Sequence, residues 1–222
     1  MRVRQVVLAA HDLDATVERL RSALPLGEPY HDPGVAEFGL RNAVMGLGDA
    51  FVEVVSPVRP DTAAGRHLDR RGGDSGYMVL VQVDDLAAAR ERAADLGIRT
   101  VWTADEPAIS ASHLHPSDTG GGTLLSLDEP RPPASWQWGG SAFDPAAAPA
   151  TVSVTLAVPD PGGVAARWST LLDRAARDDA IELDGGAIRF VAGDAGLCRV
   201  EVAMNGATPV RATIGGVDFA VP

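Results

Sequence analysis

Glu53 has the setting best suited to acid–base chemistry in this chain of 222 residues. It lies between two apolar pairs in the stretch FVEVV, so in a β-strand its side chain points opposite to its neighbours. If that side faces the interior, burial raises the pKa of the carboxyl and makes it a usable general base. The alternative is a strand residue on a solvated outer face, and the sequence leaves both open.

Two histidines form a second chemical feature, because His113 and His115 alternate in the stretch ISASHLH. In a strand both would face one side, where imidazole can ligate several metals or bind a substrate. The other interpretation is a pair of hydrogen-bonded structural residues. The single Cys198 lies in an apolar run without a neighbouring base, which favours a buried structural thiol.

The elements that must position these residues follow a repeat. A buried strand, an aspartate and an amphipathic helix recur at residues 4–27, 77–97 and 152–173. Asp12, Asp85 and Asp160 are placed to cap these helices. Each unit ends in an apolar run, and we take Glu53, Ser126 and Glu201 as equivalent because each follows its capping aspartate at the same distance.

The repeat predicts three units of one strand, one helix and three strands, in an α+β fold. Residues 1–130 hold the first two units, residues 131–150 are a linker rich in Pro and Ala, and residues 151–222 hold the third unit. Trp136 and Trp138 are unusual in a free linker, so we expect this segment to lie against the body.

Composition narrows the class of protein. The formal net charge of −11 argues against nucleic acid or an anionic membrane as partner. No apolar run is long enough to span a bilayer, and a lone cysteine suits a reducing cytoplasm, where we place the protein. All 19 cationic residues are arginine, which excludes Schiff-base chemistry on a lysine. Arg66, Arg70 and Arg71 cluster in one stretch, either as a solvated helix end or as a docking point for an anionic group.

Several stretches resemble one known superfamily. QVVLAAHDLDAT is similar to the usual first strand and Asp-capped helix of vicinal oxygen chelate proteins, HLDRRGGDSGYMVLVQVDDLAAA to their module junction, and HPSDTGGGTLLSL to their final hairpin. The resemblance covers about residues 3–130 and favours the branch of glyoxalase, methylmalonyl-CoA epimerase and bleomycin-resistance proteins. It implies that the first two modules form a curled sheet around a central cup. The third module either packs on this sheet or pairs across a homodimer.

The resemblance also implies one divalent metal (Zn, Ni, Co, Mn or Mg) held by the first and last strand of each module. By position, the first module supplies Gln5 and Glu53, which are acceptable oxygen ligands. The second supplies Met78 and Ser126, where the family commonly has His and Glu. A thioether and a neutral hydroxyl are poor ligands. Half of the implied metal site is therefore absent.

Three interpretations follow from the incomplete ligand set. In the first, the cup binds an organic molecule without metal, with Met78, Trp102, His115 and Ser126 among its contacts. In the second, His113 or His115 replaces the lost ligands. In the third, Gln5 and Glu53 share a metal with groups from the third unit or from a second chain, such as Glu201. The first is preferred. Glu37 resembles only loosely the place of a base in the epimerase branch, and a solvated hairpin residue is the simpler interpretation.

The functional expectation is a small-molecule protein of the glyoxalase-like branch. One form is a diverged isomerase or lyase acting next to a carbonyl, with Glu53 as its base or metal ligand. The other is a metal-free protein that binds or sequesters its ligand, as bleomycin-resistance proteins do.

Overall fold

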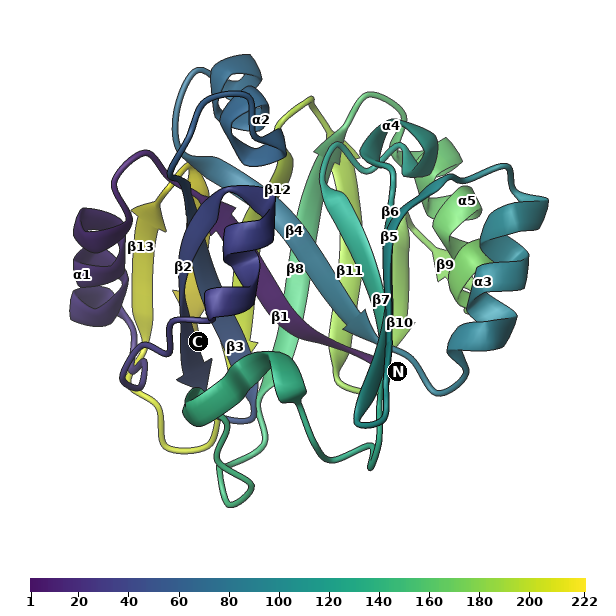
Figure 1. Ribbon diagram of the computed structural model, residues 1–222. Helices are drawn as coiled ribbons and strands as arrows, with labels where there is room; N and C mark the ends of the chain where they lie inside the picture. Colours follow the sequence, from purple (N-terminus) through teal and green to yellow (C-terminus); the bar gives the residue numbers. More distant parts are fainter.

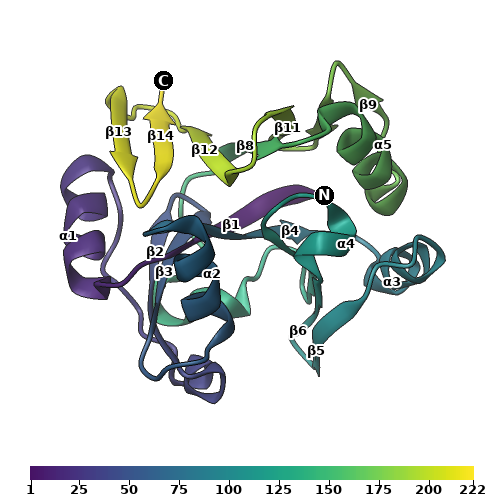
Figure 2. The same cartoon turned by 90° about the horizontal axis from the view of Figure 1, so that it is seen from above.

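The computed structural model describes residues 1–222 as two seven-stranded sheets stacked in two layers (Figures 1 and 2). Sheet A contains the strands β1 (Arg2–Ala9), β2 (Leu40–Leu47), β3 (Ala50–Pro57), β4 (Ser75–Gln82), β5 (Thr100–Glu106), β6 (Ile109–Leu114) and β7 (Leu124–Pro130). Its helical elements are α1 (Leu13–Ala23), η1 (Pro33–Phe38), α2 (Ala63–Arg71), α3 (Leu86–Asp95) and α4 (Pro116–Thr119).

Sheet A has the order β2-β3-β1-β4-β7-β6-β5 and consists of two modules joined by antiparallel pairing of β1 with β4. In each module the first and last strands are parallel neighbours, β1 with β3 and β4 with β7. Each first strand leads into a helix whose N-terminal amide is bonded by the predicted aspartate, Asp12 or Asp85. The sheet curls so that both of its ends point away from sheet B (Figure 2). The α+β class and the curled sheet are thus confirmed. The first module has two strands after its helix, not the predicted three, because residues 33–38 form the 3-10 helix η1.

Sheet B repeats this arrangement strand for strand. It has the order β13-β14-β12-β8-β11-β10-β9, with β8 parallel to β11, β12 parallel to β14, and β8 antiparallel to β12. Its elements are β8 (Thr151–Val158), α5 (Pro161–Leu172), β9 (Ala176–Arg177), β10 (Ala180–Leu183), β11 (Gly186–Ala192), β12 (Gly196–Ala203), β13 (Val210–Ile214) and β14 (Val217–Val221). The third predicted module is complete at residue 192, and the last three strands form a fourth unit that lacks a helix.

The equivalence of Glu201 with Glu53 and Ser126 is therefore wrong. Glu201 lies on β12, which pairs with β8 antiparallel, whereas the parallel neighbour of β8 is β11. Strands β9 and β10 have only two and four residues, so the third module ends earlier than the first two. The equal distance from the capping aspartate led to β12, the first strand of the fourth unit, instead of the last strand of the third. Apolar runs alone do not reveal the direction of a strand.

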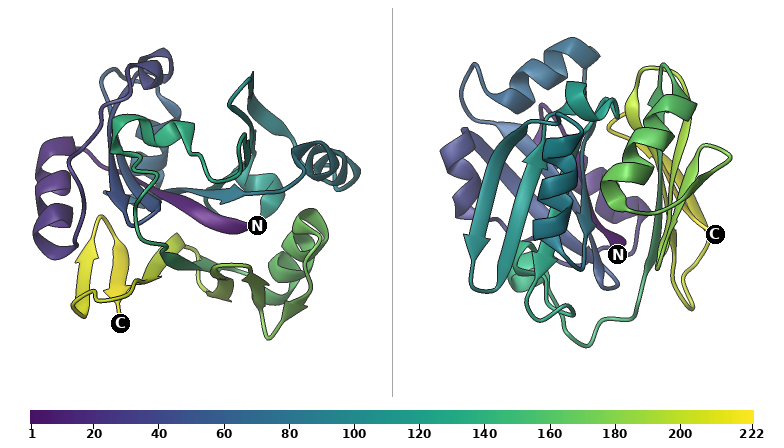
Figure 3. Two further views of the ribbon diagram at one scale, coloured as in Figure 1. Left: turned by 90° about the horizontal axis from the view of Figure 1, so that it is seen from below. Right: turned by 90° about the vertical axis from the view of Figure 1, so that its right-hand side faces the viewer.

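The two sheets share one hydrophobic core. Val6, Leu8, Val52 and Val54 of sheet A belong to the same buried cluster as the inner residues of sheet B. Gly76 on β4 permits close approach, because a Cβ there would collide with Leu197 on β12. Helix α1 packs on both β3 and β13, and α3 packs on α5, so helices flank the two layers (Figure 3). No helix is both long and apolar enough to cross a membrane.

The segment that connects sheet A to sheet B in the sequence is not a free linker. Residues 131–143 run across the open face of sheet A and include the 3-10 helix η2 (Gln137–Ala142). Trp136 is 1% exposed, and Gly139 lies against Phe51 so closely that a Cβ would clash with the ring. We call residues 131–143 the strap. It brings a distant part of the chain into the cup.

Trp168 offers a test of the joint core. It is fully buried on α5, and its indole N–H donates to the carbonyl oxygen of Thr119 at 3.0 Å, which ties sheet B to α4. Trp168→Ala should lower the free energy of unfolding by about 3–5 kcal/mol in one cooperative urea transition followed by circular dichroism and fluorescence. The exposed Val191→Ala control should change it by less than about 0.5 kcal/mol. Separate transitions for the two sheets would contradict a shared core.

Candidate active site in the cup of sheet A

The concave face of sheet A holds a cavity of about 380 Å³. Strand alternation places Phe51, Glu53 and Val55 on this face, while Val52 and Val54 enter the core between the sheets. The lining is mostly apolar and aromatic, with few polar groups, which is typical of small-molecule sites. Its polar and aromatic members are Gln5, Asp32, Glu37, Phe38, Asn42, Glu53, Tyr77, Trp102, His113 and Trp138.

Glu53 is held by two side-chain amides. Its Oε2 accepts a hydrogen bond from Gln5 Nε2 at 2.7 Å, and its Oε1 accepts one from Asn42 Nδ2, also at 2.7 Å. The three residues come from the neighbouring strands β1, β2 and β3, and the Glu53 side chain is 8% exposed overall. The geometry therefore selects the buried position that the sequence left open, and Glu53 faces the cup.

Both amides are themselves oriented by N–H donors. The indole Nε1 of Trp136 donates to Gln5 Oε1 at 2.8 Å, and the backbone N–H of Asp32 donates to Asn42 Oδ1 at 2.8 Å. An amide whose oxygen accepts from one side must present its NH₂ group to the other. The strap and the loop before η1 thus fix two donors on the Glu53 carboxylate.

Burial and hydrogen bonding act on Glu53 in opposite directions. Loss of solvent raises its pKa, while the bonds from Asn42 and Gln5 favour the charged form and lower it. Burial prevails, and the pKa of Glu53 rises to about 7. Both protonation states are then populated near neutral pH, as general acid–base chemistry requires.

The opposite wall of the cup carries an aromatic group. Trp102 on β5 packs against His113 of β6, with ring centroids 4.4 Å apart. The centroids of the Phe38 and Trp138 rings lie 6.0 and 6.3 Å from that of Trp102. Burial lowers the pKa of His113 to about 4, so its imidazole is neutral at physiological pH. Neutral imidazole can donate one hydrogen bond to a ligand in the cavity.

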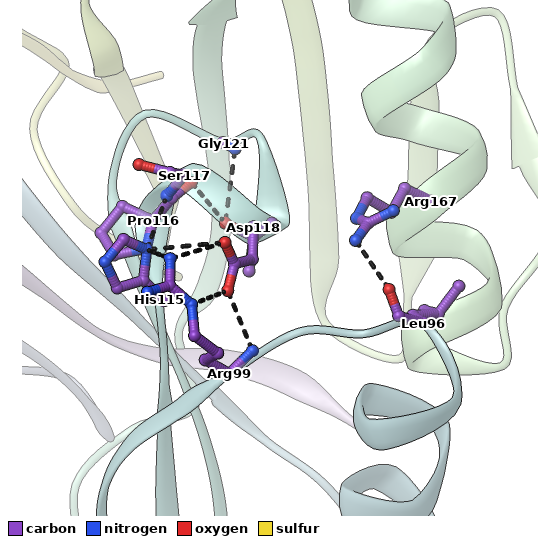
Figure 4. Close-up of polar contacts among 9 residues, drawn as sticks. Leu96, Arg99, His115, Pro116, Ser117, Asp118, Gly121 and Arg167 are labelled. Atoms are coloured by element: carbon purple, nitrogen blue, oxygen red, sulfur yellow. Dashed lines mark hydrogen bonds and ion pairs between the residues drawn. The ribbon is translucent and has the colours of Figure 1, made fainter.

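His115 does not join His113. The strand ends at Leu114, and His115 is the N-cap of α4, because Pro116 stops the strand and suits the first helical turn. Its ring lies against Arg99 and Asp118, with Nδ1 at 3.2 Å from Arg99 Nη2 (Figure 4). The expectation that both histidines share one strand face is wrong, and His115 does not line the cavity.

Met78 and Ser126 differ in their access to the cavity. Met78 lines the cavity, whereas Ser126 is fully buried and is not part of the lining. Two residues farther along β7, the fully buried Asp128 accepts from the indole Nε1 of Trp138 at 2.8 Å. Burial raises the pKa of Asp128 to about 7. This bond holds Trp138 as part of the cavity wall.

A family model described as a glyoxalase-like domain matches residues 6–172. The chain belongs to that family. The match extends over the strap and into α5, beyond the region of about residues 3–130 on which the sequence resemblance rested. Membership of the vicinal oxygen chelate superfamily is confirmed.

Epimerases are among the relatives of this glyoxalase-like protein. It is 26% identical to an ethylmalonyl-CoA/methylmalonyl-CoA epimerase of Cereibacter sphaeroides over 135 residues, which are 58% of this chain and 97% of the relative. Methylmalonyl-CoA epimerase from Mycobacterium tuberculosis superposes with a TM-score of 0.51, at 25% identity, over 58% of this chain and 87% of that one. A methylmalonyl-CoA epimerase in complex with methylmalonyl-CoA and NH4+ gives 0.50, at 26% identity, over 58% and 94%.

The side chains of this glyoxalase-like cup do not fit the metal that the superfamily implies. The Gln5 oxygen is turned toward Trp136, so its NH₂ group stands where a cation would approach Glu53. Met78 and Ser126 add only a thioether and a hydroxyl, which are poor ligands. No three His, Cys, Asp or Glu side chains come together as a ligand set.

What sequence reasoning missed in the site is the support around Glu53. Asn42 lies in the plain strand LRNAVMGL, where nothing marks it as a partner of a residue on the next strand. The bond from Trp136 to Gln5 joins residues 131 positions apart, which no local pattern records. The bond from Trp138 to Asp128 spans only 10 positions, but it depends on the strap folding back against β7. A tryptophan pair in a segment rich in Pro was the one available signal.

The raised pKa of Glu53 predicts a pH dependence of stability. Between its ordinary value of 4.5 and about 7, the folded protein keeps a proton that the unfolded chain releases, so stability falls as pH rises through this window. Ionisation of Glu53 should lower the free energy of unfolding by about 3 kcal/mol across this window. In Glu53→Gln this contribution to the pH dependence should disappear. Urea unfolding between pH 4.5 and 7.5 measures it, with the exposed Glu91→Gln as control. An unchanged slope in Glu53→Gln would refute the burial argument.

The donor set predicts metal independence. After dialysis against Zn, Mn, Ni, Co or Mg, elemental mass spectrometry of the wild-type protein should find far less than one ion per chain. Met78→His combined with Ser126→Glu and Trp136→Phe should bind about one ion, because it adds an imidazole and a carboxylate and removes the donor that holds the Gln5 oxygen away from Glu53. A stoichiometric ion in the wild type that Glu53→Ala removes would show that the amide of Gln5 turns to admit a metal.

Proposed function

We propose that this protein is a metal-independent enzyme of the isomerase type, which moves a proton next to the carbonyl of a small organic compound in the cup. The observation that carries the proposal is Glu53, a buried carboxyl with a pKa of about 7 that lines an otherwise mostly apolar cavity. The epimerase relatives support the reaction class, since epimerisation also begins with removal of a proton from carbon.

In the proposed reaction the Glu53 carboxylate takes a proton from the carbon beside the carbonyl. The C–H electron pair moves toward the carbonyl and gives an enolate, and the protonated carboxyl then returns the proton to a different carbon conjugated with the enolate, which gives the isomer. Neutral His113, on the opposite wall, is the proposed hydrogen-bond donor to the enolate oxygen. Glu53 is the single buried carboxyl in the lining, which favours a one-base proton shift over transfer between two bases.

A second candidate is a protein that binds or sequesters a ligand without turning it over. One observation favours it: both oxygens of Glu53 already accept hydrogen bonds from Gln5 and Asn42. These bonds stabilise the carboxylate and make it a weaker base. The two candidates differ in whether a bound ligand exchanges its acidic C–H.

Hydrogen–deuterium exchange tests the proposal. With α-phenylcyclohexanone and α-(dimethylamino)acetophenone in D₂O, proton NMR should show exchange of the acidic C–H faster than in protein-free buffer. Glu53→Gln should lower this rate by about 100-fold or more, while Glu91→Gln and EDTA leave it unchanged. The rate should rise with pH through about 7 as Glu53 ionises. Equal rates in wild type and Glu53→Gln would exclude Glu53 as the base, and saturable binding without exchange would favour the sequestering protein.

A further inference from the structure

The charged side chains that line the cup are all of one sign. Its lining contains three carboxyl groups, those of Asp32, Glu37 and Glu53, and no arginine. His113 adds no positive charge, because burial lowers its pKa to about 4. An anionic ligand would therefore meet like charges without a compensating cation, and like charges disfavour binding.

No arginine side chain is part of the cavity lining. Arg4 is buried behind the strap, where it donates to Gln82 and to the carbonyl oxygen of Ala134. Arg71 donates to the carbonyl oxygen of Gly122, between the two layers. Arg66 and Arg70 of α2 act on the pKa of Tyr77 from a distance, but neither lines the cavity.

The rest of the lining suits a cation with an apolar body. Phe38, Trp102 and Trp138 form a chain of ring contacts on one side, and their faces attract cations through the ring quadrupole. Glu37 lies on η1, Asp32 directly precedes η1, and Glu53 lies on β3. Glu37 and Phe38 are consecutive on η1, so a ligand in the cup would meet carboxyl groups and aromatic faces on adjoining parts of the lining.

We propose that the cup takes an organic cation, namely a compound with an apolar body and a protonated or quaternary amine. This inference rests on the cup being the ligand site in the proposed function, and it does not depend on the proton transfer. The net charge of −11 would also attract such a ligand at long range. Methylmalonyl-CoA carries a carboxylate and phosphates, so this cup disfavours the compound bound by the relative.

Three probes of matched shape test the charge preference. Benzyltrimethylammonium is the cation, 2,2-dimethyl-3-phenylpropan-1-ol the neutral analogue and 2,2-dimethyl-3-phenylpropanoate the anion. In isothermal titration calorimetry with the full chain at low salt, the cation should bind about 10-fold more tightly than the alcohol, and the anion more weakly than both. The preference for the cation should shrink in high salt, because salt screens the exposed rim charges.

Substitutions separate charge from shape. Glu37→Gln and Asp32→Asn should each weaken binding of the cation about threefold and leave the alcohol unchanged. The second retains a side-chain oxygen for the Gly34 N–H that Asp32 now bonds. Trp102→Leu should reduce the preference for cation over alcohol, and Glu91→Gln on α3 is the control that alters no affinity.

The outcomes are distinct from those of the exchange experiment. Equal binding of cation and alcohol, preference for the anion, or no binding of any probe would each overturn the inference. Deuterium exchange of a neutral ketone could still proceed in any of these cases. Conversely, tight binding of the cation without exchange of any ketone would support the ligand class and refute the proton transfer.

Discussion

The burial of the Glu53 carboxyl is the constraint on which the site depends. Glu53 as a residue is 8% exposed. A buried carboxyl is stable only if its oxygens are bonded, and here Gln5 and Asn42 supply those bonds. Each amide must in turn be held by a donor, which brings in Trp136 and the backbone of Asp32. One buried group thereby accounts for contacts from strands, a loop and the strap, whose Trp136 is 131 positions from Gln5 in the sequence.

The second layer explains how a shallow sheet can hold such a site. The convex face of sheet A is covered by sheet B in one joint core, so the curled sheet does not rely on its flanking helices alone. Because sheet B lies on the side away from the cavity, it supports the cup without narrowing it (Figure 2). The strap is the connection between the layers, and the chain uses this crossing to place Trp136 and Trp138 in the cup.

The sequence predicted local structure better than pairing. Asp12, Asp85 and Asp160 cap helices as expected, because capping is set by adjacent residues. Period-two patterns place strands but do not record their direction or partner, and Glu201 was misassigned for that reason. Similarly, Glu53 was found from its apolar neighbours, whereas Asn42 became visible only when β2 lay beside β3. The prediction for His115 is wrong because Pro116 begins helix α4 and ends the strand before His115.

Gln5 shows how a family position can change its chemistry with little change in the fold. Its amide oxygen could bind a metal. The indole N–H of Trp136, however, can only donate a hydrogen bond, and it donates to that oxygen. The NH₂ group of Gln5 therefore faces Glu53. A cation at Glu53 would hold the carboxylate ionised, whereas an amide donor leaves its pKa near 7. The same strand positions then favour a titratable carboxyl over a metal-bound one. A tryptophan in the strap, outside the paired modules, sets that choice.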